Sequence, residues 1–365
     1  MCNQSCRQPS IFCILPPHML RNVVQNGSPQ ERDAAVRTMT MDATFRIARA
    51  EQTPTSPAAR PAVLAAEGEK RRTIYTANHT QSLPGTPVRA EGSAPSGDVA
   101  VNEAYDGLGA TFDFYWDVFE RNSIDDAGLA LDATVHFGKA YDNAFWNSEQ
   151  MIFGDGDGKL FNRFTIALDV IGHELTHGVT QDEAQLRYSG QPGALNESMS
   201  DVFGALVKQF VFKQTAAQAD WLIGAGLLAK GVNGVALRSI KDPGSAYDDP
   251  ILGKDPQPKE MRHYVHTYED NGGVHINSGI ANRAFYLAAV AIGGNAWEKT
   301  GRIWYETLRD PKLRTNSGFR TFARLAATNA GQLYGQNSSE QQAVRAAWAE
   351  VGIALPVPAK HEQAA

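Results

Sequence analysis

The chain has 365 residues, of which 42% are hydrophobic and 20% charged, and its formal net charge is −6. This composition excludes a mostly disordered chain, and 33 glycines without a three-residue period exclude collagen. The charge argues against nucleic acid or an anionic membrane as a partner, and no apolar run approaches the roughly 18–20 residues of a membrane span. At about 150 residues per domain, the length predicts two domains with room for an extra segment.

Residues 1–50 predict a small N-terminal unit, with an apolar stretch at 11–15, a turn at Pro16-Pro17 and a helix at about 31–50. Such a unit is too short to bury a core alone, so we expect it to dock on the rest of the chain or to stay mobile. The prolines interrupt the apolar stretch, which therefore does not predict a secretory signal peptide. Because every cysteine lies in this unit, we expect neither disulfides nor cysteine metal sites in the main body; they are Cys2, Cys6 and Cys13.

Residues 51–97 are rich in Pro, Ala, Gly, Ser and Thr, which predicts a linker interrupted by a short strand at 73–77. The pattern of a folded body follows, with a helix at 99–121, strands at 132–138, 145–146 and 151–153, a tight Gly-Asp turn at 154–158, and a helix at 164–179. Beyond residue 190 nearly all predicted elements are helices, at 195–212, 220–229, 276–292, 297–309, 319–333 and 341–351. The predicted fold class is therefore α+β, a mixed half followed by a helical half.

The sequence His-Glu-Leu-Thr-His at residues 173–177 carries the strongest chemical signal. On a helix, His173 and His177 share one face about 6 Å apart, so both imidazoles can bind one zinc ion, with Glu174 at the edge of the site. Two helix histidines without a metal would give the same five residues, so the motif alone leaves that interpretation open.

A second acidic segment favours the metal. Glu197 lies in the next predicted helix and can complete a two-histidine, one-carboxylate site with an open position for water. Asp201 follows one turn later on the same face, where it can accept a hydrogen bond from the outer nitrogen of a zinc-bound imidazole. A lone acidic pair would normally be solvated, but these two residues lie among apolar side chains.

A catalytic zinc site also needs a proton acceptor and further hydrogen-bond donors. Glu174 is placed to act as general base and general acid. Tyr188 and His275 are candidates for stabilising negative charge on a carbonyl oxygen, and Asp270 could hold His275 protonated. From the residues alone, structural roles for Tyr188 and His275 are favoured over catalytic ones.

These segments together resemble the thermolysin-like zinc metallopeptidases over residues 101–352. The similarity rests on Asn-Ala-Phe-Trp (143–146), the Gly-Asp turn, His-Glu-Leu-Thr-His-Gly-Val-Thr (173–180), Gly-Ala-Leu-Asn-Glu-Ser-Met-Ser-Asp (193–201) and Asn-Gly-Gly-Val-His-Ile-Asn-Ser-Gly (271–279). It implies a two-domain fold with the active-site cleft between the halves. It also implies one catalytic zinc per chain and a set of roles: His173, His177 and Glu197 as ligands, Glu174 as base, Tyr188 and His275 as oxyanion donors, and Asp201 and Asp270 as the residues that orient them.

The resemblance further implies how a peptide substrate is held. The edge from Asn143 to Trp146 pairs with the substrate backbone like an added strand, with Asn143 and Ala144 contacting the peptide. Arg238 matches the arginine that binds the carbonyl just past the cleaved bond. The pocket for the residue after that bond is apolar, and we expect cleavage before Leu, Phe, Ile or Val; it consists of Phe161, Phe164, Val170, Ile223, Leu227 and Leu237. Ordinary core packing is the alternative role for these six.

Residues 13–20 resemble the short propeptide of the protealysin-like subgroup. The chain would then be a zymogen, inhibited by its first 55–70 residues until they are cleaved off. The expected inhibitory residues are Cys13, Pro16 and Pro17. Two modes stay open: either Cys13 or His18 occupies the open position on zinc, or the segment fills the cleft through apolar contacts and proline stiffness.

The calcium sites of the family match poorly. Asp169 and Asp220 fit two ligands, but the other acidic positions hold non-acidic residues, Lys208, Leu222 and Ala225. Because calcium takes six to eight oxygen ligands, we expect weak or absent calcium dependence, with Lys208 replacing the cation by pairing with Asp169. The Gly-Asp turn lacks the remaining ligands of a calcium loop, so we expect only a turn there.

The leading function is a zinc endopeptidase that is made as a zymogen and acts on peptides and proteins. Its expected domains are residues 1–65 (propeptide and linker), 66–185 (α+β) and 186–365 (helical). A catalytically silent zinc-binding protein would usually lack Glu174, and a zinc hydrolase of other substrates would not need a strand-like edge or Arg238. The resemblance predicts a secreted protein without a recognisable signal peptide, and a cytoplasmic zymogen released by another route is the alternative.

Overall fold

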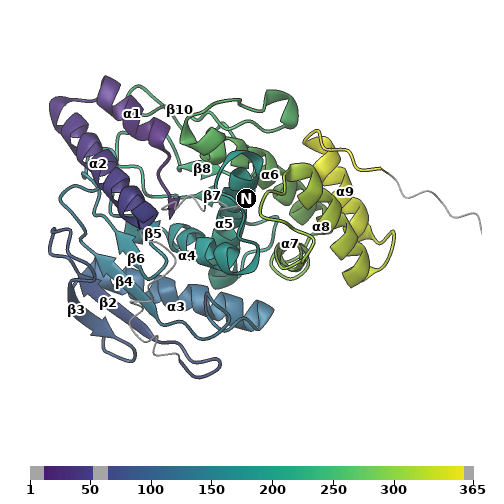
Figure 1. The fold of residues 1–365 in the computed structure, drawn as a ribbon, viewed down its shortest axis with the longest axis horizontal. Helices are drawn as coiled ribbons and strands as arrows, with labels where there is room; N and C mark the ends of the chain where they lie inside the picture. The colour runs from purple at the N-terminus through teal and green to yellow at the C-terminus, as the bar shows by residue number, and fades with distance from the viewer. Residues whose placement is uncertain (1–11, 52–64, 357–365) are drawn as a thin grey trace, which may run out of the picture.

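A computed structural model describes residues 12–51 and 65–356. Its N-terminal half is built on a six-stranded mixed sheet (Figure 1). The strand order is β1-β5-β6-β4-β2-β3, with parallel pairs β2–β4 and β4–β6 and antiparallel pairs elsewhere. The strands are β1 (Phe12–Cys13), β2 (Arg72–Thr76), β3 (Thr86–Ala90), β4 (Leu131–Val135), β5 (Ala144–Trp146) and β6 (Met151–Phe153).

The helix α3 (Val99–Phe119) packs against this sheet. Asp98 caps its first turn by accepting a hydrogen bond from the backbone N–H of Ala100. Its apolar face presents Phe112, Phe114 and Tyr115 to the core. This confirms the helix and the strand positions predicted for the segment from residue 99 to residue 153.

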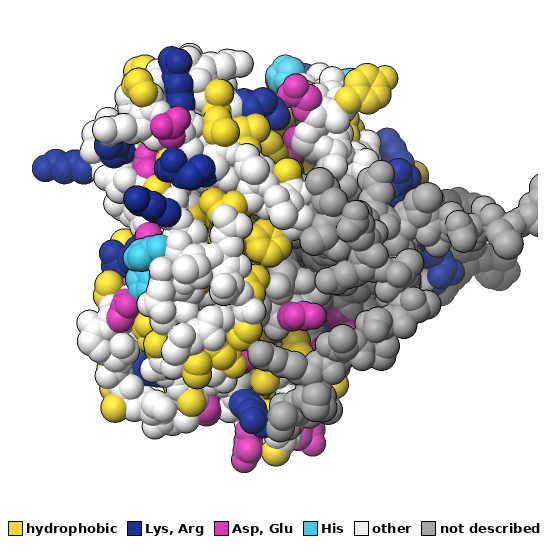
Figure 2. Space-filling view, turned by 60° about the vertical axis from the view of Figure 1, so that its left-hand side comes forward, with side chains coloured by type: hydrophobic (Ala, Val, Ile, Leu, Met, Phe, Trp, Pro, Cys, Tyr) yellow, Lys and Arg dark blue, Asp and Glu magenta, His cyan; other side chains and the backbone are white. Residues whose placement is uncertain are grey.

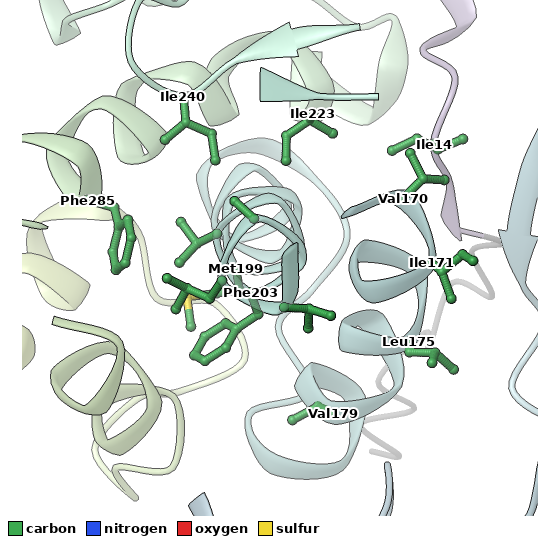
Figure 3. Packing of buried hydrophobic residues seen from close by; sticks show 14 of the residues in the cluster. Ile14, Val170, Ile171, Leu175, Val179, Met199, Phe203, Ile223, Ile240 and Phe285 are labelled. Carbon is green, nitrogen blue, oxygen red and sulfur yellow. The ribbon is translucent and has the colours of Figure 1, made fainter. Parts of the chain in front are cut away.

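Two long helices join the halves, α4 (Leu168–Glu183) and α5 (Gly190–Phe212). Figure 3 shows α5 at the centre of the core, with Met199 and Phe203 between the α4 residues and Phe285. The two helices approach closely because glycines face each other: a Cβ on Gly172 would lie 3.1 Å from the Cα of Gly204, and a Cβ on Gly204 only 2.3 Å from the carbonyl oxygen of Asp169. This close packing sets the spacing of the site described below.

The remaining helices form the C-terminal half, at the right of Figure 1. They are α6 (Asp270–Ile292), α7 (Thr300–Leu308), α8 (Phe319–Tyr334) and α9 (Ser339–Glu350), with the 3₁₀ turn η2 (Met261–His263). Two short antiparallel pairs precede α6, formed by β7 (Leu222–Ile223) with β8 (Arg238–Ser239) and β9 (Asp248–Asp249) with β10 (Gly253–Lys254). None of the described helices is both long and apolar enough to cross a bilayer. On the face shown in Figure 2, acidic and basic side chains are interspersed.

The N-terminal unit is a helical hairpin of α1 (Pro17–Asn26) and α2 (Pro29–Glu51), seen in purple at the upper left of Figure 1. The predicted helix at 31–50 is confirmed, and the prediction that the unit docks on the rest of the chain is also confirmed. The prediction of a plain turn at Pro16-Pro17 was wrong, because Pro17 begins α1. Proline fits the first helical position, where its missing N–H would have no helical partner.

Two other predictions were wrong. The strand predicted at 73–77 is confirmed as β2, but residues 86–90, expected to belong to the linker, form β3 and pair with β2 as a hairpin of the main sheet. Pro87 is tolerated there because β3 is an edge strand, where a missing N–H costs no ladder bond. The predicted helix at 220–229 is absent from the described chain, because Gly224 and Gly226 adopt positive φ angles of 74° and 88°. In addition, a 3₁₀ turn, η1 (Phe164–Ile166), replaces the first turn of the helix predicted at 164–179.

Candidate active site

Three fully buried side chains converge between α4 and α5. The Nε2 atoms of His173 and His177 lie 3.0 Å apart. Glu197 of α5 faces them, with one oxygen 3.6 Å from His173 Nε2 and the other 3.5 Å from His177 Nε2. Ligands of a tetrahedral zinc ion at 2.0–2.1 Å lie about 3.3–3.5 Å from each other, so the triangle is the right size for that ion.

The hydrogen bonds behind the two imidazoles fix their protonation. His173 donates from Nδ1 to Asp201 at 2.8 Å, and His177 donates from Nδ1 to the amide oxygen of Asn196 at 2.7 Å. Each ring therefore directs an unprotonated Nε2 into the site, and two such lone pairs 3.0 Å apart repel each other unless a cation lies between them. Glu197 adds a buried Oε2 that accepts no hydrogen bond from the described residues. The donor set thus fits zinc.

Asp201 is the hub of a buried network. Besides His173, it pairs with the guanidinium of Arg238 at 2.8–3.1 Å and accepts a hydrogen bond from the Asn282 amide at 2.8 Å. Burial would raise the pKa of Asp201, but Arg238 and His173 outweigh it and hold that pKa below its usual range. The carboxylate therefore stays charged and keeps both His173 and Arg238 oriented.

Glu174 lies one residue after His173, fully buried at the edge of the triangle. Its Oε2 accepts a 3.1 Å hydrogen bond from the backbone N–H of Trp146, while its Oε1 has no donor among the described residues. Burial, and then the neighbouring Glu197, raise the pKa of Glu174 well above its usual value. Such a carboxylate is a better proton acceptor than an exposed one.

Tyr188 and His275 lie on the other side of Glu197. The Tyr188 hydroxyl donates to Glu197 and lies 3.3 Å from His275 Nε2. Asp270 accepts from His275 Nδ1 at 2.6 Å and from its backbone N–H at 2.9 Å. Burial alone would lower the pKa of His275, but Asp270 and then Glu197 raise it to about 9, so the ring presents an Nε2–H donor to the cleft.

Residues 12–15 lie in the cleft as an added strand. Strand β1 pairs antiparallel with the edge strand β5, with Phe12 opposite Trp146 and Cys13 opposite Phe145. The ladder continues with hydrogen bonds from Ile14 N–H to the Ala144 carbonyl at 3.2 Å and from Leu15 N–H to Asn143 Oδ1 at 3.1 Å.

Two carbonyl groups of the same segment contact the site. His275 Nε2 lies 3.0 Å from the carbonyl oxygen of Cys13, and the Arg238 guanidinium donates to the carbonyl of Ile14 at 3.0 Å. The two carbonyl groups on either side of the Cys13–Ile14 peptide bond thus meet His275 and Arg238, two residues to which the resemblance assigns contacts with a substrate.

The side chain of Ile14 is fully buried in the apolar cluster that contains all six residues of the expected specificity pocket. Figure 3 shows Ile14 beside Val170, with Ile223 close by. Leu227 and Leu237 flank Gly224, whose added Cβ would meet both side chains at about 3 Å. The remaining two expected pocket residues, Phe161 and Phe164, are buried in the same cluster, with their ring centroids 6.1 Å apart.

Contacts at places other than the cleft also bind the N-terminal unit to the rest of the chain. From α1, His18 Nε2 lies 2.9 Å from the Tyr247 hydroxyl. From α2, the buried carboxylate of Asp42 accepts from the Tyr141 hydroxyl at 2.5 Å and from Asn143 Nδ2 at 3.0 Å. Asp42 thereby directs the Asn143 amide oxygen toward Leu15.

The expected inhibitory residues have distinct places. Cys13 contributes its carbonyl to His275, while its side chain belongs to an apolar cluster with Phe145 and Tyr141. Pro16 is buried and is the N-cap residue of α1, and Pro17 starts that helix. Within the described residues, the metal-ligand group at this site contains neither Cys13 nor His18. The structure therefore favours plugging of the cleft over ligation of zinc by the thiol or the imidazole.

Lys208 occupies the position where a calcium site was in question. Its ammonium lies 2.7 Å from Asp169, 2.9 Å from Asp220 and 2.8 Å from the carbonyl of Leu222. The predicted pairing with Asp169 is confirmed. Burial alone would lower the pKa of Lys208, but Asp169 and Asp220 raise it above its usual value. The Gly-Asp turn is also confirmed as a turn, since Asp157 accepts hydrogen bonds from three following backbone N–H groups.

We expect Lys208→Met to lower the free energy of unfolding by about 3–5 kcal/mol, because it leaves the buried carboxylate of Asp169 without its cation. Urea unfolding of the chain, carrying Glu174→Gln to prevent self-digestion, would measure this change. Lys213→Met, an exposed change at the end of α5, is the matched control and should have little effect. A loss below 1 kcal/mol, or a gain in wild-type stability with added calcium, would contradict this account of the site.

Several site residues were not predicted. Asn196 lies in the segment 193–201 that the sequence analysis identified, so its contact with His177 could have been predicted from that segment. Asn282, Tyr247 and Asp42 come from distant segments and carry no local signal. Their roles depend on which elements the fold brings together.

Comparisons with known proteins agree with this geometry. Residues 61–181 match the family model "Thermolysin metallopeptidase, catalytic domain", and residues 184–353 match "Thermolysin metallopeptidase, alpha-helical domain". An extracellular metalloprotease of Pectobacterium carotovorum is 52% identical over 343 residues, covering 94% of this chain and 96% of that protein. Thermolysin of Alicyclobacillus acidocaldarius is 39% identical over 292 residues, covering 76% of this chain and 50% of that protein.

A solved structure is also similar. It is the precursor of protealysin, a metalloproteinase from Serratia proteamaculans, which superimposes with a TM-score of 0.86 at 55% identity. The match covers 94% of this chain and all of that chain, 100%. The similarity therefore extends to the N-terminal unit as well as to the two halves around the cleft.

Proposed function

Because this chain belongs to the thermolysin metallopeptidase family, we propose that it is a zinc-dependent endopeptidase precursor whose N-terminal unit closes its own active-site cleft. The observation that carries this proposal is the course of residues 13–15, which run along β5 as a peptide substrate would. Their carbonyl groups meet His275 and Arg238, and Ile14 fills the apolar pocket.

His173, His177 and Glu197 are the residues that would hold the zinc ion. When bound there, zinc supplies a Lewis acid that polarises a substrate carbonyl and lowers the pKa of a water molecule toward 7. Asp201, Asn196 and Ser200 keep the two imidazoles in the tautomer that binds metal. These contacts support a catalytic site that is organised before substrate arrives.

Glu174 acts as the general base and acid. Its Oε1 accepts the proton of the attacking water and then passes it to the amine that leaves when the peptide bond breaks. The hydrogen bond from Trp146 N–H to Oε2 holds the carboxylate still and leaves Oε1 for this transfer. The presence of this carboxylate argues against a catalytically silent protein on the same scaffold.

Tyr188 and protonated His275 stabilise the negative charge that develops on the carbonyl oxygen. The 3.0 Å distance between His275 Nε2 and the Cys13 carbonyl oxygen marks where that oxygen would lie in a substrate. Asp270 keeps His275 protonated and is a positioning residue. Asn143, Ala144 and Arg238 bind the substrate backbone, which supports peptides rather than other compounds as substrates.

We expect the processed enzyme to cleave before Leu, Phe, Ile or Val at least about ten times faster than before Asp or Lys. The reason is that burying such a side chain in the pocket is worth about 1.5–3 kcal/mol. Sequencing the products of a mixed peptide library would measure the preference. Equal cleavage before Lys or Asp would refute the assignment of the pocket.

On this proposal, the first 65 residues serve as an intramolecular inhibitor. The two catalytic halves are residues 66–185 and 186–365. The substrates are peptides and proteins. Three relatives of this chain are named proteases, and two of those names include the word extracellular. We therefore extend secretion to this chain, with calcium unnecessary because Lys208 takes the place of the cation.

A further inference from the structure

A second group of metal-binding side chains lies at the carboxyl ends of three neighbouring parallel strands. His79 follows β2, His136 follows β4 directly, and Asp155 follows β6. Because parallel strands end at the same edge of a sheet, these segments meet there. The backbone N–H of His79 donates to the carbonyl of His136 at 2.8 Å, and Gly138 donates to Thr80 at 2.9 Å, so the segments are locked together.

The ligand atoms of this strand-end cluster (His79, His136 and Asp155) are already close. His136 Nδ1 lies 2.9 Å from Asp155 Oδ1, and His79 Nδ1 lies 3.3 Å from Asp155 Oδ2. One ligand atom from each residue lies within 4.8 Å of the others. These spacings bracket the roughly 3.3 Å between ligands of a tetrahedral ion. The His79 side chain is 61% exposed, so a water molecule can reach the remaining position.

Asp98 completes the arrangement. It lies 2.7 Å from His136 Nε2 and is itself fixed as the cap of α3. A carboxylate that accepts from one imidazole nitrogen leaves the other as a lone pair for a metal. Asp201 has the same relation to His173 in the first site, with the two ring nitrogens exchanged.

We propose that His79, His136 and Asp155 bind a second divalent transition-metal ion of the zinc type, with Asp98 orienting His136 and water completing the coordination. Two carboxylates and one divalent ion leave the site electrically neutral. Arg163, which interacts electrostatically with both carboxylates, is already held by Glu103 at 2.5–2.7 Å. This site shares no ligand with the catalytic site.

The competing interpretation is a metal-free ion pair. Protonated His136 can donate to Asp155 and Asp98 at once, and hydrogen bonding to Asp155 raises the pKa of His136 to about 9 although burial opposes it. That ion pair does not need His79, whereas a metal ion does. His79 therefore separates the two interpretations, and because its side chain is exposed, we expect its substitution to leave the fold intact.

The ion would tie together the ends of β2, β4 and β6. Phe137 follows His136 and packs against Phe45 of α2, with ring centroids 5.6 Å apart. The metal would thus stabilise the face of the sheet on which the N-terminal unit docks. Zinc should raise the temperature of unfolding of the chain, by an amount that grows with the logarithm of the ratio of free zinc to the dissociation constant.

The test is equilibrium dialysis of the full chain against low-micromolar free zinc, followed by measurement of zinc per chain. Glu174→Gln prevents self-cleavage, and Cys2→Ser with Cys6→Ser removes thiols that would bind zinc by themselves. We expect two zinc ions per chain, and one in the additional variant His79→Gln. Asp98→Asn, which can still cap α3, should weaken the second ion about 10–100-fold.

His263→Gln is the matched control, since His263 is another exposed histidine near a carboxylate and should leave two ions bound. The part of the zinc-dependent rise in unfolding temperature that comes from the second ion should be lost in His79→Gln, which keeps the part due to the catalytic ion, and His263→Gln should keep the full rise. One ion in both the parent chain and His79→Gln, or two in both, would overturn the proposal. One ion in the parent chain and none in His79→Gln would instead contradict the catalytic site and support the second.

Discussion

Glu174→Gln should lower kcat/KM of the processed enzyme by about 10²–10⁴-fold while the protein keeps its catalytic zinc. Glutamine has nearly the same shape and can still accept the hydrogen bond from Trp146 N–H, but it cannot take a proton at neutral pH. The change removes no hydrogen bond to His173, His177 or Glu197, so zinc binding should survive. Steady-state kinetics and zinc analysis of the same preparation would measure both effects.

Glu149→Gln is the matched control for this change. Glu149 is exposed in the turn between β5 and β6, so its neutralisation should leave turnover within a factor of two or three. If Glu174→Gln retained wild-type activity with its zinc in place, the mechanism proposed here would be discarded. If it lost zinc together with activity, the assignment of Glu174 as base rather than ligand would need revision.

Ile14→Asp should release the cleft. Ile14 is fully buried in the apolar core beside the proposed specificity pocket, and losing that apolar contact costs about 1.5–3 kcal/mol, with a further penalty for a carboxylate among apolar side chains. We therefore expect the uncleaved precursor to be at least about 10–100 times more active than the wild-type precursor. Initial rates on a peptide substrate would measure this, with intact mass recorded at each time point to show that the chain is still whole.

Val36→Asp provides the comparison for that experiment. Val36 also lies in the N-terminal unit, but it is 49% exposed on α2, so a carboxylate there should leave the precursor as inactive as wild type. An Ile14→Asp precursor as silent as wild type would show that the cleft is closed by other contacts. The Asp42 contacts with Tyr141 and Asn143 would then be the next candidates.

The catalytic groups could be predicted because their signals are local. His173, Glu174 and His177 lie within one helical turn, and Glu197 and Asp201 share a face of the next helix. The pairing of these two helices follows from apolar faces and from small residues such as Gly172 and Gly204. The helical spacing of apolar residues was also enough to predict α2, α3 and the C-terminal helices.

The course of the N-terminal segment could not be predicted in the same way. Strand β1 has two residues, too few for an alternating pattern, and its partner β5 is far away in the sequence. Pro16 and Pro17 suggested a turn, yet they are the N-cap and the first residue of the helix α1. Residues 13–15 can bind through their backbone only if the folded protein leaves an edge strand without a partner. The sequence does not show which strand that is.

Two other errors have clear physical causes. Proline-rich composition suggested a linker at 86–90, where β3 instead pairs with β2, because an edge strand tolerates proline. The apolar content at 220–229 suggested a helix, but Gly224 and Gly226 take left-handed backbone conformations and bring Leu227 and Leu237 around the pocket. In both places the tertiary context decided the local structure.

The most direct test of the account is anomalous diffraction at the zinc edge from crystals of the purified chain. We predict a peak within about 2.0–2.2 Å of the Nε2 atoms of His173 and His177 and of a carboxylate oxygen of Glu197. A map without a transition metal at these three side chains, from protein that hydrolyses peptides, would contradict the central claim.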